Sequence, residues 1–242
     1  MRKLFLDKID NILTLQGENH NHLSVVLRSK AGDTVTVCNG DGYDYEFKIA
    51  AITKTETRLE LTDKKQNFSE SVINLTLYSA VLKGDKNDTV VRTCTELGVN
   101  EFCPIITTNA AAKTESYKTD RLQKIALEAA KQSGRGKVPK VNAPIAFTKM
   151  CDELKKFDLV VFAYENFVKD NIKDFLLENF KNKDCKNIAA IVGGEGGFTQ
   201  DEANALINLN VKPLHLGNRI LRADTATATV VAIIMFTAGE MQ

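Results

Sequence analysis

The feature that most constrains the fold is the alternation, between Ile73 and Thr237, of short apolar runs with segments of helix length. The apolar runs predict strands at Ile73–Tyr78, Glu101–Ile106, Asp158–Ala163, Asn187–Val192 and Lys212–Leu216. The other segments predict helices at about Lys86–Leu97, Asp120–Gln132, Lys169–Phe180, Gln200–Asn208 and Thr225–Thr237. Such alternation is typical of an α/β fold in which helices cover both faces of a parallel sheet. Ligands of such sheets bind beside the carboxyl ends of the strands, so we expect the site there.

The segment before Ile73 has the pattern of a small β domain. Its predicted elements are a short helix at Glu18–Leu27, strands at Thr34–Val37, Tyr43–Ile52 and Thr57–Leu61, and a polar linker at Asp63–Ser71. The turn residues Asn39–Gly42 favour a hairpin because glycine and asparagine adopt positive φ angles at low cost. We therefore expect a small β-barrel over residues 1–70 and an α/β domain over residues 71–242.

Composition places the chain among ordinary globular proteins, with 43% hydrophobic and 26% charged residues in a length of 242. The longest unbroken apolar run, Val230–Phe236, has seven residues, whereas a membrane-spanning helix needs about 20. Charged residues among the first eight positions replace the apolar stretch of a signal peptide. These patterns predict a cytoplasmic protein that has no membrane span.

Cysteine and histidine are sparse and scattered. The five cysteines include no pair with the two-residue spacing of zinc or redox motifs, and the three histidines have no neighbouring ligand cluster. We expect neither disulfides nor a metal. His215 falls inside a predicted strand and is interpreted as a core histidine.

A glycine-rich loop follows the predicted strand that ends at Val192. Four of the five residues Gly193–Gly197 are glycine, and Thr199 with Glu202 forms a capping-box pattern that predicts the start of a helix. One or two glycines suffice for a sharp turn. Four of them favour a loop whose main chain lies directly against a ligand.

A second unusual loop, Leu216–Ala226, joins the last predicted strand to the last helix. Asp224 or Thr225 is a natural helix cap. Arg219 and Arg222 suit a phosphate or a developing negative charge, although an exposed arginine pair is the ordinary alternative. The sequence has no P-loop, no G-x-G-x-x-G spacing and no G-x-S-x-G elbow, which argues against the corresponding NTPases, dinucleotide-binding enzymes and hydrolases.

The most basic stretch of the chain runs from Lys113 to Lys140. Eight basic residues there stand against three acidic ones, Glu115, Asp120 and Glu128, although the whole chain has a net charge of only +1. A solvated helix face and a nucleic-acid contact are both compatible with this excess.

The two loops together resemble the paired cofactor loops of knotted SPOUT-class RNA methyltransferases. Within that class the chain is similar to the bacterial 16S rRNA (uracil-N3)-methyltransferases of the RsmE type. Further matching stretches are His22–Arg28, Thr95–Val99 and Glu128–Arg135. Gly194 and Asp224 stand where that family usually has proline and glutamate.

The resemblance implies a PUA-like β-barrel followed by a SPOUT domain with a C-terminal trefoil knot, assembled as a homodimer. It implies S-adenosylmethionine as cofactor. The residues it places around the cofactor are Tyr164, Glu165, Val192, Gly193, Gly194, Glu195, Gly196, Gly197, Leu216, Gly217, Asn218, Ile220, Leu221, Thr225 and Ala226.

The implied substrate is 16S rRNA, within the small ribosomal subunit. Uracil N3 is a weakly acidic nitrogen engaged in base pairing, so the enzyme must present an unpaired base and stabilise its deprotonated form. Arg222 is the first candidate for that stabilisation and Arg219 the second, while Asp224 or Glu96 accepts the proton. The predicted RNA-binding residues are Arg2, Lys3, His22, Arg28, Arg121, Lys124 and Arg135.

Two alternatives stay open on the sequence. A related SPOUT enzyme would methylate a ribose 2′-oxygen or a guanine, since the cofactor loops do not define the target. A noncatalytic RNA-binding or ribosome-assembly factor would retain a degenerate pocket, and the intact glycines argue against it.

Overall fold

A computed structural model describes residues 2–110, 117–166, 170–182 and 184–241. Lys113 and Glu115 of the basic stretch, and Lys169 at the start of a predicted helix, lie outside these residues. The chain divides into two compact units, one of residues 1–70 with 130–138 and one of residues 71–129 with 139–242. The return of residues 130–138 to the first unit departs from the continuous second domain that the sequence pattern predicts.

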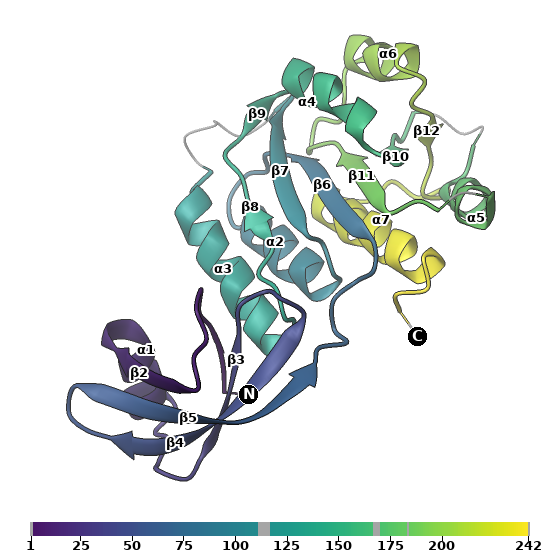
Figure 1. Cartoon of the computed structure of the whole chain (residues 1–242). Helices are drawn as coiled ribbons and strands as arrows, with labels where there is room; N and C mark the ends of the chain where they lie inside the picture. Colours follow the sequence, from purple (N-terminus) through teal and green to yellow (C-terminus); the bar gives the residue numbers. More distant parts are fainter. Residues whose placement is uncertain (1, 111–116, 167–169, 183, 242) are drawn as a thin grey trace. The chain divides into compact units, whose positions relative to one another are not determined.

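The small unit contains a five-stranded sheet in the order β1-β3-β4-β5-β2 (Figure 1). Its strands are β1 Lys3–Phe5, β2 Ile12–Gln16, β3 Thr34–Cys38, β4 Tyr43–Ile52 and β5 Glu56–Gln66. β1 runs parallel to β3, and the other neighbours are antiparallel. The pairing runs from β1 to β2 without closing into a ring among the described residues, so the unit is an open sheet and not a hydrogen-bonded barrel.

The sequence analysis did not predict β1 and β2. Its prediction of a linker was wrong for Asp63–Gln66, because these residues pair with Tyr43–Glu46 of β4 and extend β5. The predicted helix is present as α1 Gly17–Asn21, which continues into a π-helical turn at His22–Val26.

One face of the small sheet carries the core of this unit. Val35 and Val37 of β3 and Phe47 and Ile49 of β4 alternate along their strands and are buried together with Leu23 of the π-helical turn. Because side chains alternate between the two faces of a strand, the residues between these positions project from the opposite face.

The large unit contains a parallel sheet in the order β12-β10-β11-β6-β7-β8, with β9 also pairing with β7. Its strands are β6 Asn74–Ala80, β7 Glu101–Ile106, β8 Lys140–Val141, β9 Ile145–Ala146, β10 Leu159–Ala163, β11 Asn187–Val192 and β12 Pro213–Leu214. The predicted parallel sheet is confirmed. β8 and β9 have two residues each, too few to leave a pattern in the sequence.

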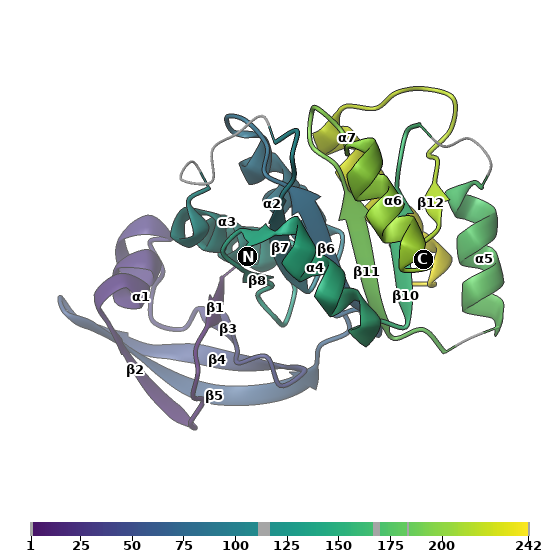
Figure 2. The ribbon, with the colours of Figure 1, turned by 90° about the horizontal axis from the view of Figure 1, so that it is seen from above.

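Helices cover both faces of this sheet, as Figure 2 shows. They are α2 Lys86–Glu96, α3 Thr119–Gln132, α4 Phe147–Glu153 with a 3₁₀ turn Leu154–Lys156, α5 Ile172–Asn182, α6 Gln200–Asn208 and α7 Ala223–Thr237. Met150 of α4 and Leu206 of α6 pack with Ala189 and Ile191 of β11 on one face. α2 and α7 pack against each other on the opposite face. None of the described helices combines the length and hydropathy needed to cross a bilayer.

Candidate functional site

A cavity of about 630 Å³ lies at the carboxyl ends of β10, β11 and β12, within the large unit. This volume falls in the range of about 300–1,000 Å³ that is usual for small-molecule sites. Its lining includes both loops singled out in the sequence, the glycine-rich loop after β11 and the loop between β12 and α7. A second cavity, of about 690 Å³, lies at the amino ends of β10 and β12, where Asp158, Leu159 and Lys212 line it. The cavity at the carboxyl ends is the one that lies where a ligand is expected.

Most of the predicted cofactor and charge-stabilising residues line this cavity. Those that do are Tyr164, Glu165, Val192, Gly193, Gly194, Glu195, Gly196, Gly197, Leu216, Gly217, Asn218, Arg219, Ile220, Leu221, Arg222 and Ala226. Thr225, Asp224 and Glu96 are not part of the lining. Sequence reasoning missed Lys86, Ala163, His215 and Ala223, which line it as well.

The glycines after β11 are required by packing as well as by backbone conformation. A Cβ on Gly196 would lie 2.8 Å from the carbonyl oxygen of Asn109, and the Asn109 side-chain amide donates a hydrogen bond to the Gly196 carbonyl at 3.1 Å. Gly197 has φ +63°, in the left-handed region that glycine favours. Close packing against Asn109, and not only access for a ligand, therefore requires glycine at position 196.

The exit of the glycine loop is held by a carboxylate with several donors. The predicted capping box is confirmed: Glu202 N donates to Thr199 Oγ1, and Thr199 N donates to Glu202 Oε2 at 2.9 Å. Glu202 Oε1 also accepts from the main-chain nitrogen of Thr108 at 2.8 Å. This side chain therefore ties the start of α6 to the segment after β7.

The middle of the loop is held by an ion pair that the sequence did not reveal. Glu195 Oε1 accepts from Lys86 Nζ at 2.8 Å and from the Lys83 main-chain nitrogen at 3.3 Å. Burial by itself would raise the pKa of Glu195, but the hydrogen bonds from Lys86 and the main chain outweigh it and hold the pKa below its ordinary value. Glu195 is therefore a carboxylate at neutral pH, beside the cavity.

In the loop between β12 and α7, the end of the strand and the cap of the helix both differ from the prediction. β12 ends at Leu214, and His215 is half-buried at the cavity wall, where its Nδ1 accepts a hydrogen bond from Gly217 N at 3.2 Å. The interpretation of His215 as a core histidine within a strand was therefore wrong. The extended backbone of Arg222 makes it the N-cap of α7, so neither Asp224 nor Thr225 caps this helix.

Arg219 and Arg222 are exposed, and neither side chain has a hydrogen bond or ion pair with any described residue. Asp224, in the first turn of α7, has a buried carboxylate oxygen, Oδ1, without a hydrogen-bond partner among the described residues. Glu96 is exposed at the far end of α2. Because a helix rises about 1.5 Å per residue, Glu96 lies about 15 Å along α2 from Lys86 at the cavity wall, which excludes it from this cavity as a proton acceptor.

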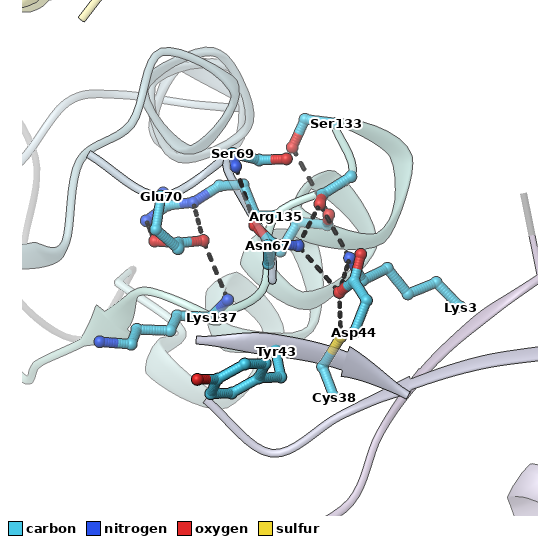
Figure 3. A network of polar contacts seen from close by, with 12 residues as sticks. Lys3, Cys38, Tyr43, Asp44, Asn67, Ser69, Glu70, Ser133, Arg135 and Lys137 are labelled. Carbon is cyan, nitrogen blue, oxygen red and sulfur yellow. Dashed lines mark hydrogen bonds and ion pairs between the residues drawn. The ribbon is translucent and has the colours of Figure 1, made fainter. Parts of the chain in front are cut away.

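Two predicted RNA-binding residues, Lys3 and Arg135, instead form buried ion pairs within the small unit (Figure 3). Lys3 is 1% exposed, and its Nζ donates to Asp44 Oδ1 at 3.0 Å and to the Gly134 carbonyl at 2.8 Å. Arg135 is 2% exposed and donates to both carboxylate oxygens of Glu70, at 3.2 and 2.9 Å. Both predictions were wrong, because these charges are buried against carboxylates and are inaccessible to phosphates.

The same network connects residues 130–138 to the small unit, because Lys3 Nζ and Asn67 Nδ2 both donate to the Gly134 carbonyl, at 2.8 and 3.3 Å. Asn67 Nδ2 donates to Asp44 Oδ1 at 2.8 Å, and Cys38 Sγ donates to the same oxygen (Figure 3). Burial would raise the pKa of Asp44, but the hydrogen bonds from Cys38, Asn67 and Lys3 hold it below its ordinary value. Burial, reinforced by Asp44, raises the pKa of Cys38 to about 12, so the thiol stays protonated and acts as donor.

The remaining predicted RNA-binding residues differ in their solvent exposure and in whether they have an ion-pair partner. Arg2 pairs with Asp33 at 2.9 Å, and Arg121 pairs with Asp88. Lys124 and Arg28 are exposed and have no side-chain partner among the described residues. His22 is half-buried at the start of the π-helical turn, and Arg28 just after that turn has φ +48°.

The cavity suits a ligand that is recognised mainly by main chain. The glycines of both loops bring main chain to the cavity wall, and Gly217, with φ +111°, has open space where a side chain would begin. Among the described residues no three metal-ligating side chains gather. A nucleoside-sized ligand with one charged end fits this combination of volume, bare main chain and the Lys86–Glu195 pair.

Comparisons with known proteins agree with this site. A family model described as an RNA methyltransferase domain matches residues 69–235, and one described as an RNA methyltransferase PUA domain matches residues 15–62. A Rickettsia conorii protein named ribosomal RNA small subunit methyltransferase E is 33% identical, over 91% of this chain and 88% of its own. A Bacillus subtilis protein of the same name is 28% identical, over 92% and 89%.

A solved structure shares the fold over nearly the whole length. It is a Legionella pneumophila protein, described as a methyltransferase and solved in complex with the cofactor S-adenosylmethionine. It has a TM-score of 0.85 to this chain at 26% identity, and the match covers 97% of both chains.

Proposed function

The chain belongs to the family of RNA methyltransferases, and from this we propose that it methylates N3 of a uridine in the rRNA of the small ribosomal subunit, with S-adenosylmethionine as cofactor. The observation that carries the proposal is the cavity at the carboxyl edge of the large sheet, lined by the two loops Val192–Gly197 and Leu216–Arg222. One volume thus brings together glycine main chain for a nucleoside and, for a nucleic acid, two guanidinium groups that have no partner in the part of the chain that the structure describes.

The cofactor would be held by the main chain of these two loops, with Tyr164 and Glu165 beside it. When bound, it supplies an electrophilic methyl group. The Lys86–Glu195 ion pair fixes the middle of the first loop, and Asn109 with Glu202 fixes its end. These ties hold the loop in a binding conformation before the cofactor arrives, which lowers the cost of ordering it.

On the substrate side, Arg222 stabilises the negative charge that uracil gains when N3 loses its proton. The Arg222 guanidinium has no carboxylate partner among the described residues, so all its donors are available to that charge, and Arg219 is the second donor. Asp224 accepts the proton. Its Oδ1, in the first turn of α7, is buried and has no hydrogen-bond partner among the described residues, which supports this role.

RNA would contact basic residues of each unit. Lys124 in α3 and Arg28 with His22 in the small unit are the predicted contacts that remain accessible, and Lys124 and Arg28 have no partner among the described residues. Arg2 and Arg121 would have to exchange an existing carboxylate partner for a phosphate. We therefore place the principal phosphate contacts at Arg28 and Lys124.

A C-terminal trefoil knot, a homodimer and a cytoplasmic location complete the proposal. The sheet order supports the knot, because β12 lies beyond β10 whereas the following helix α7 returns to pack on β11 and α2. Such threading of one chain segment through another is rare in proteins. Sedimentation of the purified chain tests the dimer.

The deciding experiment is mass spectrometry of nucleosides from small-subunit rRNA incubated with the protein and S-adenosylmethionine. We expect one equivalent of 3-methyluridine. Methylated ribose or methylguanine would redirect the proposal to another RNA methyltransferase. Absence of any product together with absence of cofactor binding in calorimetry would refute it.

A further inference from the structure

The loop between β12 and α7 presents an apolar side chain to solvent at the wall of the cavity. Ile220 is 89% exposed, the largest exposed fraction of any large apolar side chain among the described residues, and it still lines the cavity. Its neighbour Leu221 is half-buried. The loop therefore turns one apolar side chain inward and the preceding one outward.

Two exposed arginines flank this isoleucine. Arg219 and Arg222 have no side-chain partner among the described residues, whereas Arg121 and Arg135 pair with Asp88 and Glu70. The loop is anchored at both ends, by β12, which ends at Leu214, and by α7, which begins at Ala223. An apolar group between two free guanidinium groups matches the chemistry of a nucleic acid, with its apolar base faces and its phosphates.

We infer that Ile220 is a wedge that enters the RNA stack when the target uridine leaves it. This inference rests on the proposed function, since N3 of a paired uracil cannot react until the base is unpaired. Apolar side chains, isoleucine among them, occupy gaps between bases and offset part of the cost of unstacking. Arg219 would contact the backbone of the distorted strand, and Arg222 would face the extruded base.

The charge of the loop between β12 and α7 favours RNA over a second copy of this chain as the partner of Ile220. A protein interface tends to exclude unpaired charges from its apolar centre, and here two like charges flank a single apolar side chain. RNA supplies phosphates of the opposite charge next to apolar base faces. A second copy covering Ile220 is the outcome to be tested against.

The test compares two RNAs in single-turnover methylation: a small-subunit rRNA stem with the target uridine paired, and the same stem with the opposing base deleted. At saturating S-adenosylmethionine, Ile220→Ala should lose about 5- to 50-fold more of its rate on the paired RNA than on the unpaired one, because a wedge acts on unstacking whereas a contribution to the cofactor site lowers both rates alike. Ile220→Leu, which keeps the apolar volume, should recover most of the loss. Ile207→Ala is the matched control, since Ile207 is 40% exposed on α6 and lies outside the cavity.

Three results would overturn the inference while leaving the proposed function standing. Equal losses on both RNAs would make Ile220 a general contact, and no loss on the paired RNA would remove it from the reaction. A change in sedimentation of Ile220→Ala would assign the side chain to a contact between copies. If the wild-type protein methylates neither RNA, the proposed function itself fails.

Discussion

The cavity of the large unit and the buried network of the small unit use basic side chains in opposite ways. At the cavity, Arg219 and Arg222 are exposed and have no partner among the described residues. In the network, the side chains of Lys3 and Arg135 are 0% and 3% exposed and are matched to Asp44 and Glu70. A buried charge must be paired to be tolerated, whereas an exposed one stays available to a ligand. Net basic charge along the sequence does not distinguish the two.

The largest expected effect comes from breaking the network. Arg135→Ala leaves Glu70 buried without its bidentate partner, which should lower the free energy of unfolding by about 3–5 kcal/mol. Urea unfolding followed by circular dichroism measures it. Arg2→Ala, which removes a half-exposed pair with Asp33, is the control and should cost less than about 1 kcal/mol. If Arg135→Ala keeps full stability and instead loses RNA affinity, Arg135 is an RNA contact after all.

The second-largest effect is expected at the exposed arginines of the cavity. Arg222→Ala should lower the single-turnover methylation rate by about 10²- to 10³-fold, the usual cost of losing one preorganised donor to a developing charge. Arg222→Lys should recover part of the rate, because a point charge does not reproduce the planar fork.

Cofactor affinity and unfolding provide the check on Arg222. Both should hardly change in Arg222→Ala, since its side chain makes no capping hydrogen bond at α7. Arg92→Ala, an exposed arginine on α2, is the matched control. A loss of S-adenosylmethionine binding in Arg222→Ala would make this residue a cofactor clamp and contradict its role toward the uracil.

A smaller effect separates two glycines of one loop. Gly196→Ala places a Cβ 2.8 Å from the Asn109 carbonyl oxygen, whereas a Cβ at Gly194 comes no nearer than 3.3 Å to another atom, the Ala80 methyl. Overpacking of this kind costs about 1–3 kcal/mol, so Gly196→Ala should weaken S-adenosylmethionine binding and lower the melting temperature more than Gly194→Ala. Calorimetric titration and thermal unfolding measure the two. Equal effects would show that main-chain access, and not packing on Asn109, governs the loop.

The smallest effect concerns RNA affinity. Lys124→Gln should flatten the dependence of log affinity on log salt by about 0.7 to 0.9, the value for one lost phosphate contact. Arg121→Gln should flatten it less, because Asp88 already neutralises that guanidinium. Filter binding at several salt concentrations gives both slopes. An unchanged slope for Lys124→Gln would return α3 to the role of a solvated helix face.

The sequence by itself determined the parallel sheet and the position of the cavity. Strand and helix periodicities are local, and the glycine run and the capping box at Thr199 and Glu202 are local signals that a loop follows β11. In a parallel sheet the ends of strands lie at one edge, so two loops far apart in sequence could be expected to meet. β8 and β9 were not predicted because they are short and pair with the distant strand β7. The polar end of β5 was not predicted as strand because its pairing with β4, and not its composition, makes it one.

Only the tertiary structure decided which charges are free. Lys3 and Asp44 are 41 residues apart, and Arg135 and Glu70 are 65 apart, so no local pattern shows that residues 130–138 return to the first unit and bury these cations. The position of Lys86 at the cavity likewise depends on a contact between distant residues, its ion pair with Glu195, which is 109 residues away along the chain. The identity of a side chain is written in the sequence, but its solvent exposure and its partner are properties of the packed chain, because burial and Coulombic attraction act between neighbours in space.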